Sequence, residues 1–389
     1  MKNVINVIKL SIKALLTKKS NIDYSKWIFS SSFNTKFNYN SKYLFEHILK
    51  HETGITPLFV INDTKLKNVL QRKYGKKHFI DTRTKSGQNE VLKSGVWLTS
   101  AGLPLYGLFL NKRRVIVNLW HGVPLKKIAL LENNISYFKK LYFQFVFSNN
   151  YTYVITTSTS LVSIMAKSFN VNEKKVKILG QPRNDLLFKK SEKKQTVFRL
   201  FRSLPDSDKI ILYAPTYREY AQTKLFPFED FDINELNSFL ENHKIILFIR
   251  MHQSEIQNLT TFEKSKRIQF INDDKVKDIM EILNIFDLLV TDYSSIYIDY
   301  LLSHKPIIFL PYDKKKYSNK RGFNFHYNEV TPGPKPNTLV EFMREINLLL
   351  YNKNYYKEER ININNYFNEI KVNSSNLIID FIQKEIEKK

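Results

Sequence analysis

Short apolar segments recur along the chain, and the stretches between most of them have the spacing of helices. Chains that alternate strand and helix in this way fold into parallel sheets covered by helices on both faces. The pattern runs twice, with a charged stretch at 189–194 between the two series. We therefore predict an α/β fold with two doubly wound domains facing a central cleft. The expected strands are 26–31, 58–62, 96–100, 114–119, 154–157 and 176–179 in the first series, and 210–213, 245–249, 268–271, 288–291 and 306–310 in the second.

Domain boundaries follow from the two series. We expect a first domain over 1–190, a second over 191–345, and a charged helical segment over 346–389 that packs back on the first. A helix is expected at 276–286, between two strands of the second series. A chain of 389 residues is long enough for two domains of ordinary size.

A net charge of +24 predicts a polyanionic partner, which leaves nucleic acid, an anionic membrane or a phosphate-rich substrate open. The absence of cysteine excludes disulfides and thiol chemistry. At the N-terminus, lysines interrupt the apolar residues, so we expect neither a signal peptide nor a membrane span. Two interpretations remain even, an interfacial amphipathic helix and a helix packed on its own domain. The residues on its apolar face are Ile5, Ile8, Ile12, Leu15 and Leu16.

Residues able to hold phosphate or move protons follow several predicted strands. Ligands of open α/β sheets bind outside the carboxyl ends of the strands, so these residues are candidates for a common site. They are His121, Gly122 and Lys126 after 114–119, Arg183 after 176–179, Thr216 and Arg218 after 210–213, Arg250 and His252 after 245–249, and Asp292, Ser294 and Ser295 after 288–291.

This set of side chains suits a phosphodiester or diphosphate ligand. The arginines present forked donors and Lys126 a point charge. Ser294 and Ser295 stand where a strand turns into a helix, which is a favourable phosphate position, although a simple helix cap is the alternative. His121 lies in a Gly-Pro loop, where an imidazole can accept a proton near neutral pH. No carboxylate pair with metal spacing accompanies them, so we predict no metal.

Six blocks of this sequence resemble the signatures of the CDP-glycerol glycerophosphotransferases that build teichoic acids. They stand in the family's order between about residues 90 and 340. The blocks are His121 to Lys127, Gly180 to Asp185, Tyr213 to Thr216, Arg250 to His252, Thr291 to Ser295, and Arg321 to Phe323 followed by Pro332 to Pro334.

The resemblance implies a GT-B architecture and a reaction without a cofactor, in which CDP-glycerol is the donor substrate. His121 would then be the base that deprotonates an acceptor hydroxyl. Arg250, His252, Ser294 and Ser295 would hold the donor phosphates, with Arg321 as a further basic contact in the second domain. Gln253 and His326 depart from the family pattern, which expects proline and an acidic residue there.

The resemblance also implies a lipid-linked glycan or glycerophosphate acceptor at the cytoplasmic face of the membrane, for wall teichoic acid or a similar capsule. The stretch 137–147 is rich in rings and lysine, and we interpret it as a docking segment for an anionic membrane. A buried helix is the alternative. The residues expected to dock are Lys139, Lys140, Phe143, Phe145 and Phe147.

Other functions remain open from the sequence. A CDP-ribitol ribitolphosphotransferase or another GT-B enzyme with a nucleotide-sugar donor would use the same fold. A basic, aromatic-rich chain is also compatible with binding RNA or single-stranded DNA, although no nucleic-acid motif is recognisable and we expect no nucleic-acid partner. Whether the enzyme primes or polymerises is not indicated.

Overall fold

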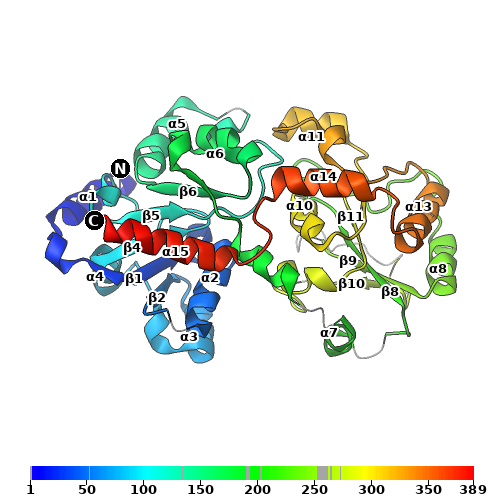
Figure 1. The fold of residues 1–389 in the computed structure, drawn as a ribbon, viewed down its shortest axis with the longest axis horizontal. Helices are drawn as coiled ribbons and strands as arrows, with labels where there is room; N and C mark the ends of the chain where they lie inside the picture. Colours follow the sequence, from blue (N-terminus) through cyan, green and yellow to red (C-terminus); the bar gives the residue numbers. More distant parts are fainter. Residues whose placement is uncertain are drawn as a thin grey trace. The chain divides into compact units, whose positions relative to one another are not determined.

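The chain forms two compact α/β units, each built on a parallel sheet (Figure 1). The computed structural model describes residues 2–51, 53–133, 135–189, 193–201, 204–251, 262, 265–271 and 273–389. Unit 1 comprises residues 1–185 and 369–389, and unit 2 comprises residues 186–368. The predicted α/β class with parallel sheets is confirmed.

The sheet of unit 1 has seven strands in the order β3-β2-β1-β4-β5-β6-β7, and all its pairings are parallel. The chain builds outward from β1 in one direction and from β4 in the other, so the topological switch point lies between these two strands. The strands are β1 (Asp23–Ser30), β2 (Thr56–Val60), β3 (Phe79–Ile80), β4 (Ser94–Thr99), β5 (Val115–Asn118), β6 (Tyr153–Thr156) and β7 (Val176–Ile178).

Apolar side chains of the unit 1 strands form a core with helices from distant parts of the chain. Alternate residues such as Trp27 and Phe29 face α2 and α3, and Ile378 and Ile382 of α15 complete the same cluster. Figure 1 shows α15 running beside α2, and the two helices are in contact. The helices of unit 1 are α1 (Lys2–Leu16), α2 (Tyr39–Lys50), α3 (Thr64–Tyr74), α4 (Lys85–Lys93), α5 (Tyr137–Phe143), α6 (Val162–Phe169) and α15 (Ser374–Glu387).

The sheet of unit 2 has five parallel strands in the order β10-β9-β8-β11-β12, with its switch point between β8 and β11. Residues of both faces are buried, as expected for a sheet covered by helices on either side. The strands are β8 (Lys209–Ala214), β9 (Ile245–Ile249), β10 (Ile268–Phe270), β11 (Leu288–Thr291) and β12 (Ile307–Phe309). The helices are α7 (Lys193–Leu200), α8 (Ile233–Asn242), α10 (Ile296–Tyr300), α11 (Lys314–Arg321), α12 (Tyr327–Val330), α13 (Leu339–Tyr351) and α14 (Lys357–Phe367).

The prediction of a helix over 276–286 is wrong. Two short 3-10 turns, Ile279–Glu281 and Leu283–Ile285, occupy this segment. The ammonium group of Lys305 donates to the carbonyl oxygens of Asn284 and Phe286 at 2.6 and 2.7 Å. The carbonyl oxygens at the end of the segment thus bind a lysine from the next connection of the sheet.

The C-terminal region divides between the two units. Helices α13 and α14 belong to unit 2, where Phe342 and Ile346 of α13 enter the core cluster of the sheet. Only α15 belongs to unit 1, and the carboxylate of Asp185 accepts hydrogen bonds from the amide nitrogens of Ser374 and Ser375 at its start. The compact units thus separate at 185/186 and 368/369, whereas the sequence suggested boundaries at 190 and 345.

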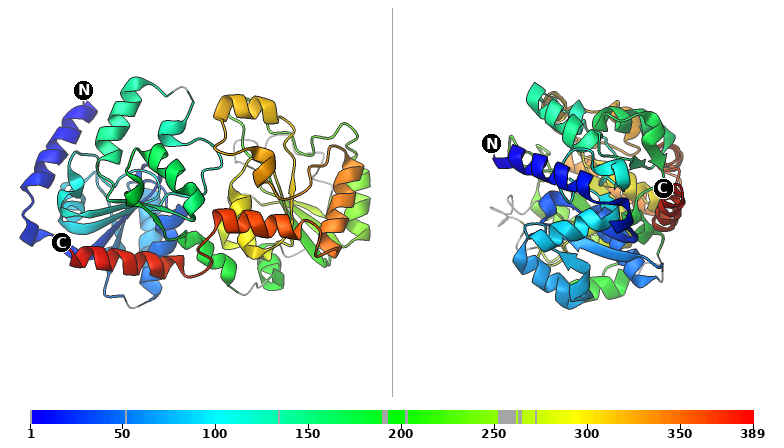
Figure 2. Two further views of the ribbon diagram at one scale, coloured as in Figure 1. Left: turned by 45° about the horizontal axis from the view of Figure 1, so that its top comes forward. Right: turned by 90° about the vertical axis from the view of Figure 1, so that its left-hand side faces the viewer.

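Helix α1 leaves its apolar face uncovered. Ser11 and Ala14 are buried against unit 1, and the Ser11 hydroxyl accepts a hydrogen bond from the amide nitrogen of Leu108. The right-hand view of Figure 2 shows α1 projecting from its unit with its N-terminal end outermost. Within the described residues, no helix is both long and apolar enough to cross a bilayer. The large side chains exposed on α1 are Ile5, Ile8, Ile12, Leu15 and Leu16.

Candidate functional site

His121 lies at the carboxyl edge of the unit 1 sheet, in the loop that follows β5. The backbone of Trp120 takes a left-handed φ of 50°, and its amide nitrogen donates to the Asn118 side chain at 2.9 Å. This turn brings the imidazole to Ser100, the residue after β4, which is one of the two strands at the switch point. His121 is therefore held where a doubly wound sheet places its ligands.

Aromatic rings and one backbone carbonyl fix the His121 side chain. Its ring stacks on Tyr39 at a centroid distance of 4.4 Å and lies 4.0 Å from the Trp120 ring. Its Nδ1 lies 2.9 Å from the carbonyl oxygen of Ser100, so Nδ1 carries the proton and donates. The neutral imidazole then keeps its lone pair on Nε2, which is the arrangement that a general base needs.

The surroundings of His121 keep the imidazole neutral. Burial lowers the pKa of His121 to about 4, the hydrogen bond to Ser100 opposes this, and the charge of Arg183 adds to the lowering. Arg183 also donates from Nη1 to the carbonyl oxygen of His121 at 2.8 Å. At neutral pH the side chain is thus unprotonated, and the lone pair on Nε2 is free of a proton.

The Gly180 to Asp185 block supports the His121 loop. Gly180 has a φ of 78°, and a Cβ there would lie 2.3 Å from the Ser374 hydroxyl, so only glycine fits. The side chain of Asn40 donates to the carbonyl oxygens of Leu119 and Trp120 at 3.1 and 3.0 Å. Asn40 is buried within α2, and no pattern in the sequence indicates this contact. Gly122 and Lys126 are half-buried in the same loop.

A buried ion-pair network occupies the carboxyl edge of the unit 2 sheet. The guanidinium of Arg218 is fully buried, and it binds Asp292 at 2.5 Å and Asp313 at 2.9 Å. Asp292 also accepts a hydrogen bond from the amide nitrogen of Thr216 at 2.8 Å. These residues follow β8, β11 and β12, so the network joins three strand ends across the switch point.

The donors of Arg218 are directed at carboxylates and not at an open phosphate site. Burial lowers the pKa of Arg218, but Asp313 and Asp292 outweigh it and raise that pKa above its ordinary range. The rings of Tyr293 and Tyr312 lie 5.2 and 4.8 Å from the guanidinium. The sequence interpretation of Arg218 as a phosphate ligand does not fit this geometry, and the geometry assigns it a scaffolding contact.

Ser294 and Ser295 stand beside this network in the turn between β11 and α10. Ser295 is at the cap position of the helix, yet its hydroxyl makes no capping hydrogen bond, while Ser294 accepts a long one of 3.4 Å from the amide nitrogen of Ile296. Both residues are half-buried. The simple cap that the sequence left open is therefore not what the Ser295 hydroxyl provides.

The other residues predicted to hold the CDP-glycerol phosphates differ in how far other protein groups already bind them. Arg250 donates to the carbonyl oxygens of Ile271 and Val276 at 3.2 and 2.5 Å and pairs with Asp273, so it anchors the neighbouring loop. Arg321 makes a 3.4 Å contact with Glu219, with both side chains substantially exposed. His252 lies outside the described residues.

Residues between 314 and 329 line a cavity, and two of its rings pack on Tyr293, the residue before Ser294. Phe323 and Tyr327 line it, and both rings pack on Tyr293 at centroid distances of 5.7 and 5.5 Å. His326, one of the two departures from the family pattern, lines the same cavity. The Pro332 to Pro334 block has a structural role, because the carbonyl oxygen of Pro334 accepts from the amide nitrogen of Phe309 at 3.0 Å. Within the described residues, no group of three or more acidic or histidine side chains has the arrangement of a metal site.

The sequence matches one known family over almost its whole length. The family model of the CDP-glycerol:poly(glycerophosphate) glycerophosphotransferases matches residues 12–384. The chain belongs to this family. The resemblance carried by the sequence blocks is therefore confirmed.

Relatives within the family act on both kinds of polyol phosphate. The chain is 28% identical over 382 residues to the teichoic acid poly(ribitol-phosphate) polymerase of Bacillus spizizenii, covering 95% of this chain and 57% of that protein. It is 27% identical over 374 residues to the teichoic acid glycerol-phosphate transferase of Staphylococcus aureus, covering 89% of this chain and 90% of that protein. This chain thus spans little more than half of the first relative.

Among solved structures, the wall teichoic acid polymerase TagF matches with a TM-score of 0.76 and 24% identity, over 98% of this chain and 93% of that chain. A glycosyltransferase and UDP-N-acetylglucosamine 2-epimerases match at lower scores. The predicted GT-B type of fold, with two doubly wound units, is confirmed.

Proposed function

We propose that this chain transfers glycerol phosphate from CDP-glycerol to a hydroxyl of a lipid-linked teichoic acid or teichoic-like capsule acceptor, and releases CMP. The observation that carries the proposal is the neutral imidazole of His121, held at the switch point of its sheet by Ser100, in a member of this family. Family membership supports CDP-glycerol as donor, and a TagF variant has been solved after soaking with CDPG.

In the proposed reaction, Nε2 of His121 accepts the proton of the acceptor hydroxyl. The freed oxygen attacks the phosphorus that bears glycerol, a new phosphodiester bond forms, and the bond from that phosphorus to the bridging oxygen breaks. CMP leaves with the electron pair of the broken bond. The residues of this chain supply the base and the phosphate contacts, and the donor supplies the energy of its diphosphate.

We assign the donor to the carboxyl edge of the unit 2 sheet. The Ser295 hydroxyl makes no capping bond, and Tyr293, two residues earlier, packs on two rings that line the cavity at 314–329. The Thr216 hydroxyl is buried without a hydrogen-bond partner in the described part of the chain. Hydroxyl groups and helix-start amides suit diphosphate oxygens, while the Arg218 network keeps their backbone in place.

The test is product analysis with purified chain and a lipid-linked glycerophosphate primer. With CDP-glycerol we expect CMP and a primer heavier by one or more glycerol phosphate units. Ribitol phosphate is the second candidate, because a ribitol-phosphate polymerase is among the relatives. Faster transfer from CDP-ribitol would reassign the donor, and CMP release from neither would refute the transferase proposal.

We propose that unit 1 docks on an anionic membrane through α1 and α5. The helix α5 has no buried residue, which rules out the alternative of a buried helix for that part of 137–147. Both α1 and the segment after α5 pack on the loop at 106–110, since Ser11 binds Leu108 and the ring of Phe147 contacts Tyr106. Two sets of exposed apolar side chains thus flank one loop.

The structure changes which rings are expected to dock. Phe143 and Phe147 are half-buried and stack on each other at 5.1 Å, so they support the helix. Phe138 and Phe145 are 81% and 51% exposed and are better candidates, with Lys139 and Lys140 exposed beside them. Exposed rings next to lysine suit an interface with anionic headgroups.

Sedimentation with vesicles tests the docking surface. The double substitution Phe138→Glu/Phe145→Glu should release the chain from vesicles that contain phosphatidylglycerol. Phe33→Glu, which changes a ring 84% exposed elsewhere on unit 1, is the matched control and should still sediment. Equal sedimentation of the double variant and the control would refute docking at α5.

A further inference from the structure

Unit 2 also has a basic pocket. It lies at the amino ends of the strands, at the edge of the sheet opposite to the family blocks that follow the strands. The pocket, of about 380 Å³, is formed where β8, β11 and β12 begin, between the end of α13 and the start of α14. Its volume falls in the range of small-ligand pockets, which is roughly 300–1,000 Å³. The polar and charged residues that line it are Lys209, Asp287, His304, Lys305, Lys353, Lys357 and Arg360.

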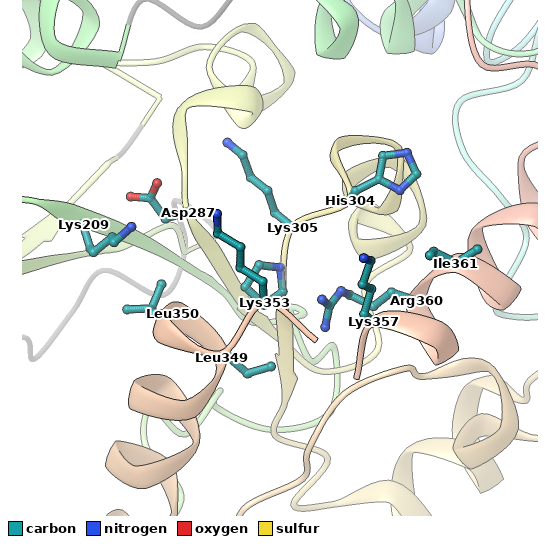
Figure 3. A pocket seen from close by; sticks show the side chains of 11 residues that line it. Lys209, Asp287, His304, Lys305, Leu349, Leu350, Lys353, Lys357, Arg360 and Ile361 are labelled. Carbon is teal, nitrogen blue, oxygen red and sulfur yellow. The ribbon is translucent and has the colours of Figure 1, made fainter. Parts of the chain in front are cut away.

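Cations outnumber anions in this pocket. Figure 3 shows Lys357 and Arg360 close together on α14, with Lys209 and Asp287 on the opposite side. Asp287 is the only carboxylate among the lining residues, and it accepts a hydrogen bond from the amide nitrogen of Ile210 at 2.7 Å. Lys353 and Lys357 are exposed, and within the described residues neither has a carboxylate at ion-pair distance. Such a concentration of like charge favours an anionic ligand.

Arg360 forms a buried, charged part of the pocket wall. Its side chain is 94% buried by area, one guanidinium nitrogen donates to the carbonyl oxygen of Tyr355 at 2.8 Å, and Nε has no partner among the described residues. Burial lowers the pKa of Arg360, and the charge of Glu359 opposes this. A buried guanidinium that lacks a carboxylate partner is costly, so an anion bound beside it would be stabilising.

We propose that this pocket binds a phosphate group of a polyanionic ligand, at a site separate from the donor site. The donor site is expected at the carboxyl ends of the strands, whereas this pocket lies at their amino ends. Arginine and lysine together suit phosphate oxygens, the first with a fork and the second as a point charge. A polyol-phosphate chain and an anionic lipid headgroup present the same group.

Binding measurements with the full chain test the proposal without depending on transferase activity. The probes are fluorescent poly(glycerol phosphate) and vesicles with or without phosphatidylglycerol. The double substitution Lys353→Glu/Lys357→Glu reverses two exposed charges at the mouth of the pocket. Lys266→Glu/Lys384→Glu makes the same change in net charge at exposed positions elsewhere and is the matched control.

We expect the pocket variant to bind the polymer or the anionic vesicles at least about tenfold more weakly, in a salt-dependent manner, and the control to bind like the unmodified chain. Loss for the polymer alone identifies the polymer as the ligand, and loss for vesicles alone identifies the lipid. An equal loss in the control, or no effect of either variant on any probe, would overturn the proposal. CDP-glycerol binding should be unchanged in both variants, which separates this site from the donor site.

Discussion

The two sheets present different chemistry at corresponding edges. At the switch point of unit 1 the neutral imidazole of His121 stacks on Tyr39 and donates a hydrogen bond to the carbonyl oxygen of Ser100. At the switch point of unit 2 a buried arginine joins Asp292 and Asp313, and the hydroxyl groups stand beside this network. The same fold thus places a neutral imidazole at one strand edge and a buried ion-pair network at the other. The difference teaches that position at a strand end does not by itself decide which partners a side chain has.

The largest effect is expected at His121. His121→Ala removes the proposed base, and general base catalysis contributes roughly 10²- to 10⁴-fold in rate. We predict a loss of this size in acceptor-dependent CMP release at saturating donor. A matched control is His78→Asn, which alters a buried histidine that binds the carbonyl oxygen of Pro57. Turnover of His121→Ala within a few-fold of the unmodified chain would remove His121 from the chemistry.

A large change in stability is expected at Arg218. Arg218→Met leaves Asp292 and Asp313 buried without their cation, which costs about 3–5 kcal/mol of unfolding free energy. Arg321→Met, at an exposed pair with Glu219, should cost less than about 1 kcal/mol. Urea denaturation followed by circular dichroism measures both. Similar midpoints for the two variants would show that the network does not hold the strand ends.

A smaller effect is expected at Ser295. Ser295→Ala should weaken CDP-glycerol binding by about 1–3 kcal/mol, the cost of a lost hydrogen bond to a charged group. Its unfolding free energy should stay unchanged, because the hydroxyl makes no capping bond. Calorimetric titration and urea denaturation of the same preparation distinguish the two. A fall in stability with donor affinity intact would make Ser295 only a structural residue.

The smallest effect on turnover at neutral pH is expected in the pH profile. Because the pKa of His121 is lowered to about 4, the base form persists above that pH, and the acid limb of kcat/KM should lie near it. The charge of Arg183 contributes to the lowering, so Arg183→Gln should raise the pKa and move the acid limb upward. The same shift has a linked effect on stability. Folded chain should lose stability as pH falls from 6.5 toward 4, since the unfolded imidazole binds its proton first. An acid limb that Arg183→Gln leaves in place would contradict this coupling.

Much of the fold could be predicted from the sequence because buried parallel strands are nearly continuous apolar runs. The exceptions include two segments. The strand β3, Phe79–Ile80, is too short to give a pattern, and 276–286 forms two 3-10 turns. Local periodicity does not reveal either one.

The residues of the candidate site could be named only in part from the sequence. Strand-end position and the family resemblance pointed to His121 and to the Ser294 to Ser295 turn, and their roles stay predictions. The ion pairs of Arg218 could not be foreseen, because its partners Asp292 and Asp313 lie 74 and 95 residues away in the chain. Asn40 and Ser100, which hold the His121 loop, are an ordinary helix residue and an ordinary strand end in the sequence. Only the folded chain brings them together.

The most direct test of this division between the two sheets is the equilibrium affinity of the His121→Ala chain for CDP-glycerol. If unit 2 holds the donor and His121 supplies only the base, the dissociation constant should stay within about twofold of that of the unmodified chain. A loss of affinity as large as that of Ser295→Ala would contradict the account, because His121 would then bind the donor and not simply accept a proton.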